Sequence, residues 1–180
     1  MLVQKLNKKI DLPRLKGESE DIIAKFGLGH ADQFGFVNYG KPGDDTPVES
    51  YFDSTGSLFN HESGEFWAKE TDFRNFNKEF ENTYFHEIYC MFKNAGRMRL
   101  MNVPPKTCYS FHKDSNLRIH IAIDTNESSY FIFPEQSEIC HIPSDGHFYI
   151  VDTLKTHSFM NGHISKSRLH LVIDDLRGCE

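Results

Sequence analysis

The pattern of apolar and polar positions changes its period near residue 97. From there to about residue 175, apolar and polar residues alternate in short runs, as in β-strands with one buried face. Proline, glycine, asparagine and aspartate separate the runs, at Pro104-Pro105 and Asn161-Gly162 among others. Many short strands at this spacing predict a sandwich or barrel. The predicted strands are Arg97–Val103, Thr107–His112, Leu117–Ile123, Tyr130–Phe133, Glu138–Ile142, His147–Asp152 and Ser167–Asp174.

The first 96 residues are less regular and rich in aromatic side chains. Short strands are expected within Phe34–Tyr39, and a helix over Asn75–Asn94 with Gly96 just after its end. The helix is predicted from an apolar stripe at spacings of three and four, which would bury one face against a sheet. Its members are Phe76, Phe80, Tyr84, Ile88 and Met91. A length of 180 residues fits one domain, 1–180, in which region 1–96 packs on the strands of region 97–175.

Two of the predicted strands carry the same Arg-x-His pattern on one face. In Leu117–Ile123 the odd positions are aliphatic, while Arg118 and His120 share the opposite face; Arg168 and His170 repeat this arrangement in the last strand. An ordinary half-exposed strand would place such residues in water, whereas a barrel with a polar, ligand-filled interior would place them inside. Their occurrence on two strands favours a shared interior.

A metal site is predicted from three residues that are distant in sequence. His112 and Asp114 project from one face of an extended chain, and His157 follows the strand His147–Asp152. Two imidazoles and one carboxylate make a facial triad, which leaves three positions of an octahedral metal open. Arg168 comes after His157, and its planar guanidinium suits a dicarboxylate. His170 and the other histidines are expected in structural or surface roles.

Composition excludes some functions. The formal net charge of −6 argues against a nucleic-acid partner, and the basic start from Lys5 to Lys16 is expected to be a solvated face or a strand edge. None of the four cysteines forms a C-x-x-C pair, so a zinc knuckle or thioredoxin-type motif is not predicted. With no signal peptide and no apolar run of about 18 residues, the expectation is a cytoplasmic protein without a membrane partner.

The stretch from Arg97 to Asp174 resembles the aspartyl/asparaginyl β-hydroxylases, a family of Fe(II)- and 2-oxoglutarate-dependent oxygenases. The motifs that carry the resemblance are Arg97-Met98-Arg99-Leu100-Met101 with Pro104-Pro105, His112-Lys113-Asp114, Leu117-Arg118-Ile119-His120-Ile121, Asp152 with Thr156-His157-Ser158, and Arg168-Leu169-His170-Leu171-Val172-Ile173-Asp174. They span a little under half of the chain, and Asp114 matches the family members that keep the acidic ligand.

The resemblance implies a mainly β protein with flanking helices, built as a double-stranded β-helix (a cupin-like jelly roll). It implies Fe(II) on His112, Asp114 and His157, 2-oxoglutarate with its distal carboxylate on Arg168, and O2 as the oxidant. Arg118 and His120 would hold the other end of 2-oxoglutarate or face the substrate. The implied activity is hydroxylation of an amino-acid residue or free amino acid, with succinate and CO2 as co-products.

Two other functions remain open from the sequence. A cupin-type metalloenzyme that does not use 2-oxoglutarate would keep the three ligands and give Arg168 a structural role. A non-catalytic cupin-like binding module would carry a degenerate site, a reading that the intact His112, Asp114 and His157 disfavour. The oligomeric state is open under all three.

Overall fold

Two antiparallel sheets form the body of the protein, and the computed structural model describes residues 1–39, 55–60 and 62–178 of it. The strands of the large sheet are β1 (Val3–Lys9), β2 (Gln33–Gly35), β7 (Ala95–Val103), β9 (Leu117–Asp124), β12 (His147–Val151) and β14 (Arg168–Asp175). They lie in the order β1-β12-β9-β14-β7-β2. The small sheet contains β8 (Thr107–Cys108), β10 (Ser129–Phe133), β11 (Glu138–Cys140) and β13 (Ser158–Asn161), in the order β11-β10-β13-β8.

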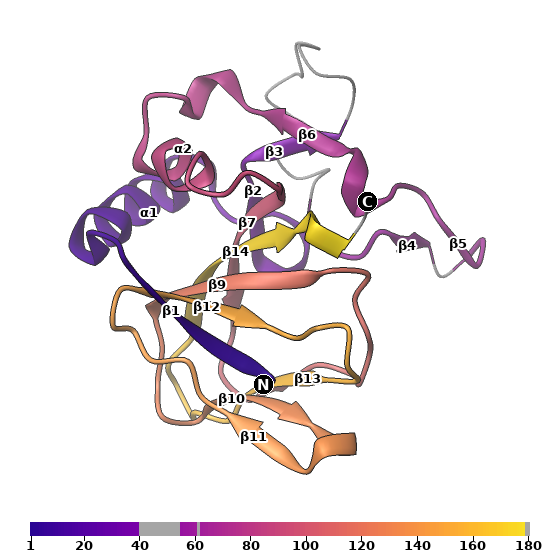
Figure 1. Ribbon diagram of the computed structural model, residues 1–180. Helices are drawn as coiled ribbons and strands as arrows, with labels where there is room; N and C mark the ends of the chain where they lie inside the picture. Colours follow the sequence, from indigo (N-terminus) through magenta and orange to yellow (C-terminus); the bar gives the residue numbers. More distant parts are fainter. Residues whose placement is uncertain (40–54, 61, 179–180) are drawn as a thin grey trace.

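Two helices cover the outer face of the large sheet. They are α1 (Leu12–Phe26) and α2 (Tyr84–Tyr89), and both lie on the side of the large sheet away from β10, β11 and β13 (Figure 1). Two small two-stranded sheets complete the fold. One pairs β3 (Val37–Tyr39) with β6 (Phe73–Phe76), and the other pairs β4 (Phe59–Asn60) with β5 (Glu65–Phe66). This arrangement confirms the predicted jelly-roll class, mainly β with flanking helices.

The alternation in β9 and β14 separates the two faces of the large sheet. Ile119, Ile121 and Leu171 belong to the main hydrophobic core, together with helix residues such as Leu15 and Ile88. The opposite face looks toward the small sheet, where a second apolar cluster includes Val103, Ala122, Phe131, Phe133, Tyr149 and Phe159. Arg118, His120 and Arg168 lie on this inner face and line a cavity, as their shared-face pattern predicted.

The helix expected over Asn75–Asn94 is wrong in extent. Phe76 ends strand β6, opposite Val37 of β3, and only Tyr84–Tyr89 are α-helical. Asn77 and Thr83 have extended backbones, with ψ angles of 121° and 165°, and therefore interrupt a continuous helix. Pairing with β3 outweighs the helical spacing, although Phe80, Tyr84 and Ile88 are buried in the main core. Gly96 does not end a helix, because it lies within β7.

Helix α1 was not predicted, although its signals are in the sequence. Asp11 caps its start by accepting a hydrogen bond from the Arg14 backbone N–H at 3.0 Å, and Leu15, Ser19 and Ile22 form its buried face. Its apolar stripe is short and its exposed face strongly charged, so periodicity over a longer window is weak.

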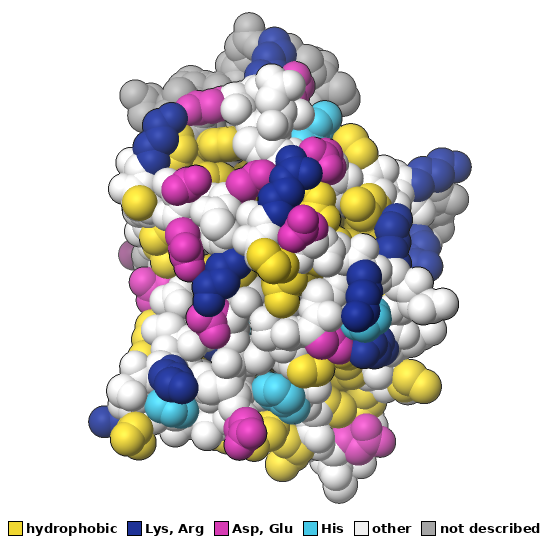
Figure 2. Space-filling view, turned by 90° about the vertical axis from the view of Figure 1, so that its left-hand side faces the viewer, with side chains coloured by type: hydrophobic (Ala, Val, Ile, Leu, Met, Phe, Trp, Pro, Cys, Tyr) yellow, Lys and Arg dark blue, Asp and Glu magenta, His cyan; other side chains and the backbone are white. Residues whose placement is uncertain are grey.

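The basic start of the chain forms an edge strand and a solvated helix face. Strand β1 pairs with β12 at the edge of the large sheet, in agreement with the expectation of a strand edge. Its lysines and those of α1 meet acidic side chains: Lys5 with Asp145 at 2.6 Å and Lys16 with Asp124 at 3.4 Å. Figure 2 shows basic and acidic side chains interspersed over this side of the molecule.

Six of the seven predicted strands differ from the observed strands by at most two residues at either end, and one differs more. The expected strand Thr107–His112 is regular only as β8, over Thr107–Cys108, and the short strand β13 after His157 was missed. No helix within the described ranges is both long enough and apolar enough to span a membrane.

Phe36→Ala is predicted to lower the free energy of unfolding by about 3–5 kcal/mol, the usual cost of an aromatic cavity in a packed core. Phe36 is fully buried and its ring centroid lies 4.2 Å from that of Phe85. Urea unfolding measures the change. The matched control Phe111→Ala removes a ring that is 56% exposed and is expected to change stability by less than about 1 kcal/mol. Equal effects of the two substitutions would contradict the packing described.

Candidate metal centre

Backbone pairing brings the two predicted histidine ligands together. The N–H of His112 donates to the carbonyl of His157 at 3.0 Å, and the N–H of His157 donates back at 2.9 Å. The two residues therefore face one another directly across an antiparallel bridge. Their imidazole centroids are 4.5 Å apart.

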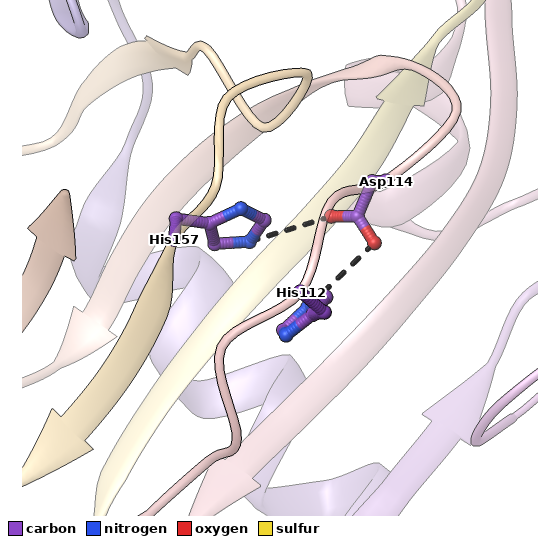
Figure 3. A group of neighbouring side chains, drawn as sticks. All are labelled: His112, Asp114 and His157. Carbon is purple, nitrogen blue, oxygen red and sulfur yellow. Dashed lines mark ion pairs between the residues drawn. The ribbon is translucent and has the colours of Figure 1, made fainter. Parts of the chain in front are cut away.

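Asp114 completes the group from the same loop as His112. Its N–H donates to the Thr153 carbonyl at 2.9 Å, which ties the loop to the chain before His157. One carboxylate oxygen lies 3.8 Å from Nε2 of His112 and the other 3.6 Å from Nε2 of His157 (Figure 3). All three ligand atoms lie within 4.8 Å of one another. The predicted His112, Asp114 and His157 thus meet at one point.

The hydrogen bonds around the triad fit a metal ion. Nδ1 of His112 lies 2.8 Å from the Ser110 carbonyl, and Nδ1 of His157 lies 3.0 Å from the Lys155 carbonyl. Each contact places the ring proton on Nδ1 and leaves the Nε2 lone pair directed toward Asp114. Oδ2 of Asp114 is buried without a hydrogen-bond partner among the described residues. A divalent cation would satisfy all three atoms.

Burial favours the ligand form of His157. Its side chain is only 4% exposed, and burial lowers the pKa of its imidazole. The neutral ring that results is the form that binds a metal. His112 is more open, with 38% of its side chain exposed, so the site has a buried side and a side that faces the cavity mouth.

Arg118 holds Asp114 in place rather than standing alone in the cavity. Its Nη2 donates to Oδ1 of Asp114 at 2.8 Å, and its Nε lies 3.2 Å from Asp174. The pKa of the Arg118 guanidinium is raised: burial opposes this, but the carboxylates of Asp114 and Asp174 outweigh it. Arg118 therefore orients the carboxylate of Asp114 by binding Oδ1, the oxygen nearer His112, while Oδ2 lies nearer His157.

His120 and Arg168 line the same cavity, which has a volume of about 1230 Å³. His120 is 4% exposed, and neither ring nitrogen has a hydrogen-bond partner within the described part of the chain. Burial, and then the charge of Arg168, lower the pKa of His120 well below its ordinary value, so the ring is neutral. His170, expected to be structural, is buried beside both residues.

Arg168 is a buried cation that has no carboxylate partner among the described residues. The residue is 2% exposed, its guanidinium lies 3.7 Å from the centroid of Phe159, and its Nη2 contacts Nδ1 of His170. Its Nε has no hydrogen-bond partner. Burial lowers the pKa of this guanidinium well below its ordinary value, a sign that its charge is uncompensated.

A buried ionic cluster beside the metal site was not assigned a role from the sequence. Asp174 on β14 lies 3.5 Å from Nε of Arg97, and Nη2 of Arg97 lies 3.0 Å from Glu70. The signal was present: Arg97 and Arg99 alternate on one strand as Arg118 and His120 do on another. Glu70 comes from a short 3₁₀ helix, Glu70–Asp72, for which periodicity gives no signal.

The fold, but no family, is found among known proteins. No family model matches the chain, and no curated protein is similar to it in sequence. The truncated collagen prolyl hydroxylase vCPH of Paramecium bursaria Chlorella virus-1 aligns with 97% of this chain and 88% of its own, at 11% identity and a TM-score of 0.51. A Pseudomonas putida prolyl-4-hydroxylase aligns over 97% and 92%, at 10% identity and a TM-score of 0.50.

A third structure, AviO1 from Streptomyces viridochromogenes Tue57, aligns over 95% of this chain and 87% of its own, at 15% identity and a TM-score of 0.51. At such low identities these similarities establish a shared fold across almost the whole chain.

Asp114→Asn is predicted to abolish stabilisation by a divalent transition metal such as Ni²⁺. A metal present at about 100 times its dissociation constant raises the free energy of unfolding by about 2.7 kcal/mol. Asn keeps the shape of the side chain but supplies no anionic ligand. Thermal unfolding with and without metal measures the effect. Asp124→Asn, at a carboxylate 60% exposed, is the matched control and should retain the full metal response; loss of response in both variants, or in neither, would contradict the site.

Glu70→Gln is predicted to flatten the dependence of stability on pH. Burial, and then the charge of Asp174, raise the pKa of Glu70 from 4.5 to about 8. The folded state therefore binds a proton that the unfolded state releases, and stability falls as pH rises between these values, by at most about 1.4 kcal/mol per pH unit. Urea unfolding of both proteins from about pH 5 to pH 8 measures the difference. Parallel curves would show that Glu70 is ionised throughout.

Proposed function

We propose that this chain is an Fe(II)- and 2-oxoglutarate-dependent dioxygenase that hydroxylates an amino-acid residue or a free amino acid. The observation that carries the proposal is the buried Arg168, which has no carboxylate partner in the described part of the chain and lines the same cavity as His112, Asp114 and His157. A cation in such a position is costly unless an anion joins it. The distal carboxylate of 2-oxoglutarate, whose other end chelates the metal, is an anion of the required kind.

The triad leaves open positions for such chelation. His112 and His157 would bind Fe(II) through Nε2, and Asp114 through Oδ2, which has no hydrogen-bond partner among the residues that the structure describes. When bound, Fe(II) and 2-oxoglutarate supply the oxidising power that uses O2 to hydroxylate a C–H bond, with succinate and CO2 as co-products. The chain's own residues would hold these groups and keep water from them.

Three polar residues that line the cavity have defined tasks in this proposal. Arg118 orients Asp114 through its hydrogen bond of 2.8 Å. Arg168, whose guanidinium lies against the ring of Phe159, would bind the distal carboxylate of 2-oxoglutarate. The low polarity of the buried cavity strengthens this ion pair. Neither ring nitrogen of the neutral His120 has a hydrogen-bond partner in the described ranges, so the ring can donate one hydrogen bond to the bound co-substrate.

Support for an amino-acid substrate comes from two directions. The motifs between Arg97 and Asp174 resemble the aspartyl/asparaginyl β-hydroxylases. Two of the proteins that share the fold are named as prolyl hydroxylases. The cavity is larger than 2-oxoglutarate alone requires, since sites for drug-sized ligands have volumes of about 300–1,000 Å³. It therefore has room for a side chain or a free amino acid beside the co-substrate.

Anaerobic addition of Fe(II) and then 2-oxoglutarate should produce a visible metal-to-ligand charge-transfer band, and admission of O2 should release succinate. Arg168→Met should raise the concentration of 2-oxoglutarate needed for half of the band by at least about tenfold, because a charge-assisted bidentate pair is lost. The surface variant Arg14→Met should leave that concentration unchanged.

The outcomes separate the three functions. Metal binding without a band or succinate would favour a cupin-type metalloenzyme that does not use 2-oxoglutarate. Absence of metal binding would favour a binding module with a degenerate site. If Arg168→Met gave half of the band at the wild-type concentration of 2-oxoglutarate, the protein would still use this co-substrate, but Arg168 would not bind it.

A further inference from the structure

A second buried guanidinium in the cavity has an unused hydrogen-bonding edge. Arg99 of β7 is 1% exposed, and its Nη1 donates to Oε1 of Gln33 at 3.3 Å. Its Nε and Nη2 have no hydrogen-bond partner within the described residues. These two nitrogens form one side of the planar guanidinium, the side that can grip a carboxylate with two parallel hydrogen bonds.

The nearby carboxylate does not satisfy this edge. Oδ1 of Asp174 lies 3.6 Å from Nη2 of Arg99, beyond hydrogen-bond distance, and 3.2 Å from Nε of Arg118. The other oxygen of Asp174 lies 3.5 Å from Nε of Arg97. A single carboxylate is therefore shared by three guanidiniums and cannot saturate Arg99.

The buried charges do not balance without a further anion. Three buried guanidiniums, those of Arg97, Arg99 and Arg168, and the partly buried guanidinium of Arg118 line the cavity. Among the described residues, the carboxylates that form ion pairs with them are Asp114, Asp174 and Glu70. Burial raises the pKa of Glu70 to about 8, which favours its neutral form at pH 7. Fe(II) and the dianion 2-oxoglutarate cancel one another. At least one positive charge remains, and burying it is costly unless a ligand compensates it.

Arg99 and Arg168 extend from well-separated backbone positions of the large sheet. In the register of the large sheet, Val103 lies opposite Arg168 and Arg99 opposite Val172. Four residues along a strand correspond to about 13 Å. The two positions are therefore separate, with Arg168 beside Phe159 of the small sheet and Arg99 beside Gln33 of the N-terminal region.

We propose that the substrate carries a carboxylate that binds the Nε and Nη2 edge of Arg99. The inference rests on the proposed function, because it assigns Arg168 to the co-substrate and leaves Arg99 for the substrate. The substrate class is then a free amino acid, or a peptide whose terminal or side-chain carboxylate lies close to the hydroxylated carbon. Arg99 acts as a specificity-determining residue that selects acids over amides.

Isothermal titration of the Ni²⁺ protein with 2-oxoglutarate tests this, because Ni²⁺ does not support turnover. The co-substrate is titrated first; N-acetyl-L-proline and N-acetyl-L-asparagine are then each compared with their C-terminal amides. At least one acid should bind about tenfold or more tightly than its amide. Arg99→Met should remove this preference, Arg99→Lys should retain part of it, and Arg14→Met should retain all of it.

Each alternative result has one meaning. Equal binding of acids and amides, or no binding of either acid up to millimolar concentration, overturns the inference while leaving the co-substrate result intact. Weaker 2-oxoglutarate binding in Arg99→Met, as large as that in Arg168→Met, would assign Arg99 to the co-substrate and also overturn it. If 2-oxoglutarate does not bind the wild-type protein, the proposed function fails. Titration of the Ni²⁺ protein with the acids and amides, without 2-oxoglutarate, then still measures whether Arg99 binds a carboxylate. Should Arg99→Met not fold, Arg99→Lys carries the comparison.

Discussion

Two backbone hydrogen bonds between His112 and His157 organise the whole site. They set residues from distant parts of the chain directly opposite one another, at the end of the small sheet. A shift of one residue in this register would turn one imidazole to the other face of the chain. The bond from the N–H of Asp114 to Thr153 fixes the third ligand against the same segment. The relative positions of the three candidate ligands therefore depend on main-chain pairing, which persists when side chains move.

The polar interior of the jelly roll follows from the alternation along three neighbouring strands. Arg99 on β7, His120 on β9 and Val172 on β14 lie in one row across the large sheet. The opposite faces of the same strands supply the apolar core beneath α1 and α2. One sheet thus stabilises the fold on one side and presents cations to a cavity on the other.

The sequence predicted the site better than it predicted the N-terminal region. His112 and Asp114, and likewise Arg118 and His120, are two residues apart in extended chain, and all four line the cavity. The helix over Asn75–Asn94 failed because Phe76 and Tyr84 enter the same core from a strand and a short helix. Spacing along the chain cannot distinguish these routes when tertiary pairing with β3 decides the backbone.

The contacts of single side chains were beyond sequence reasoning. That Arg118 holds Asp114, or that Glu70 reaches Arg97, depends on how loops cross the sheet. The pattern showed that arginines face inward but not which of them lack partners. That difference separates Arg168 and Arg99, whose guanidiniums have donors without a partner among the described residues, from Arg118, whose charge is met by carboxylates.

The most direct test of this account is a crystal structure of the protein grown anaerobically with Fe(II) and 2-oxoglutarate. The account predicts one metal ion bound by Nε2 of His112, Nε2 of His157 and a carboxylate oxygen of Asp114, with the distal carboxylate of 2-oxoglutarate on Arg168. A metal bound elsewhere, or a co-substrate whose carboxylate does not meet Arg168, would contradict it.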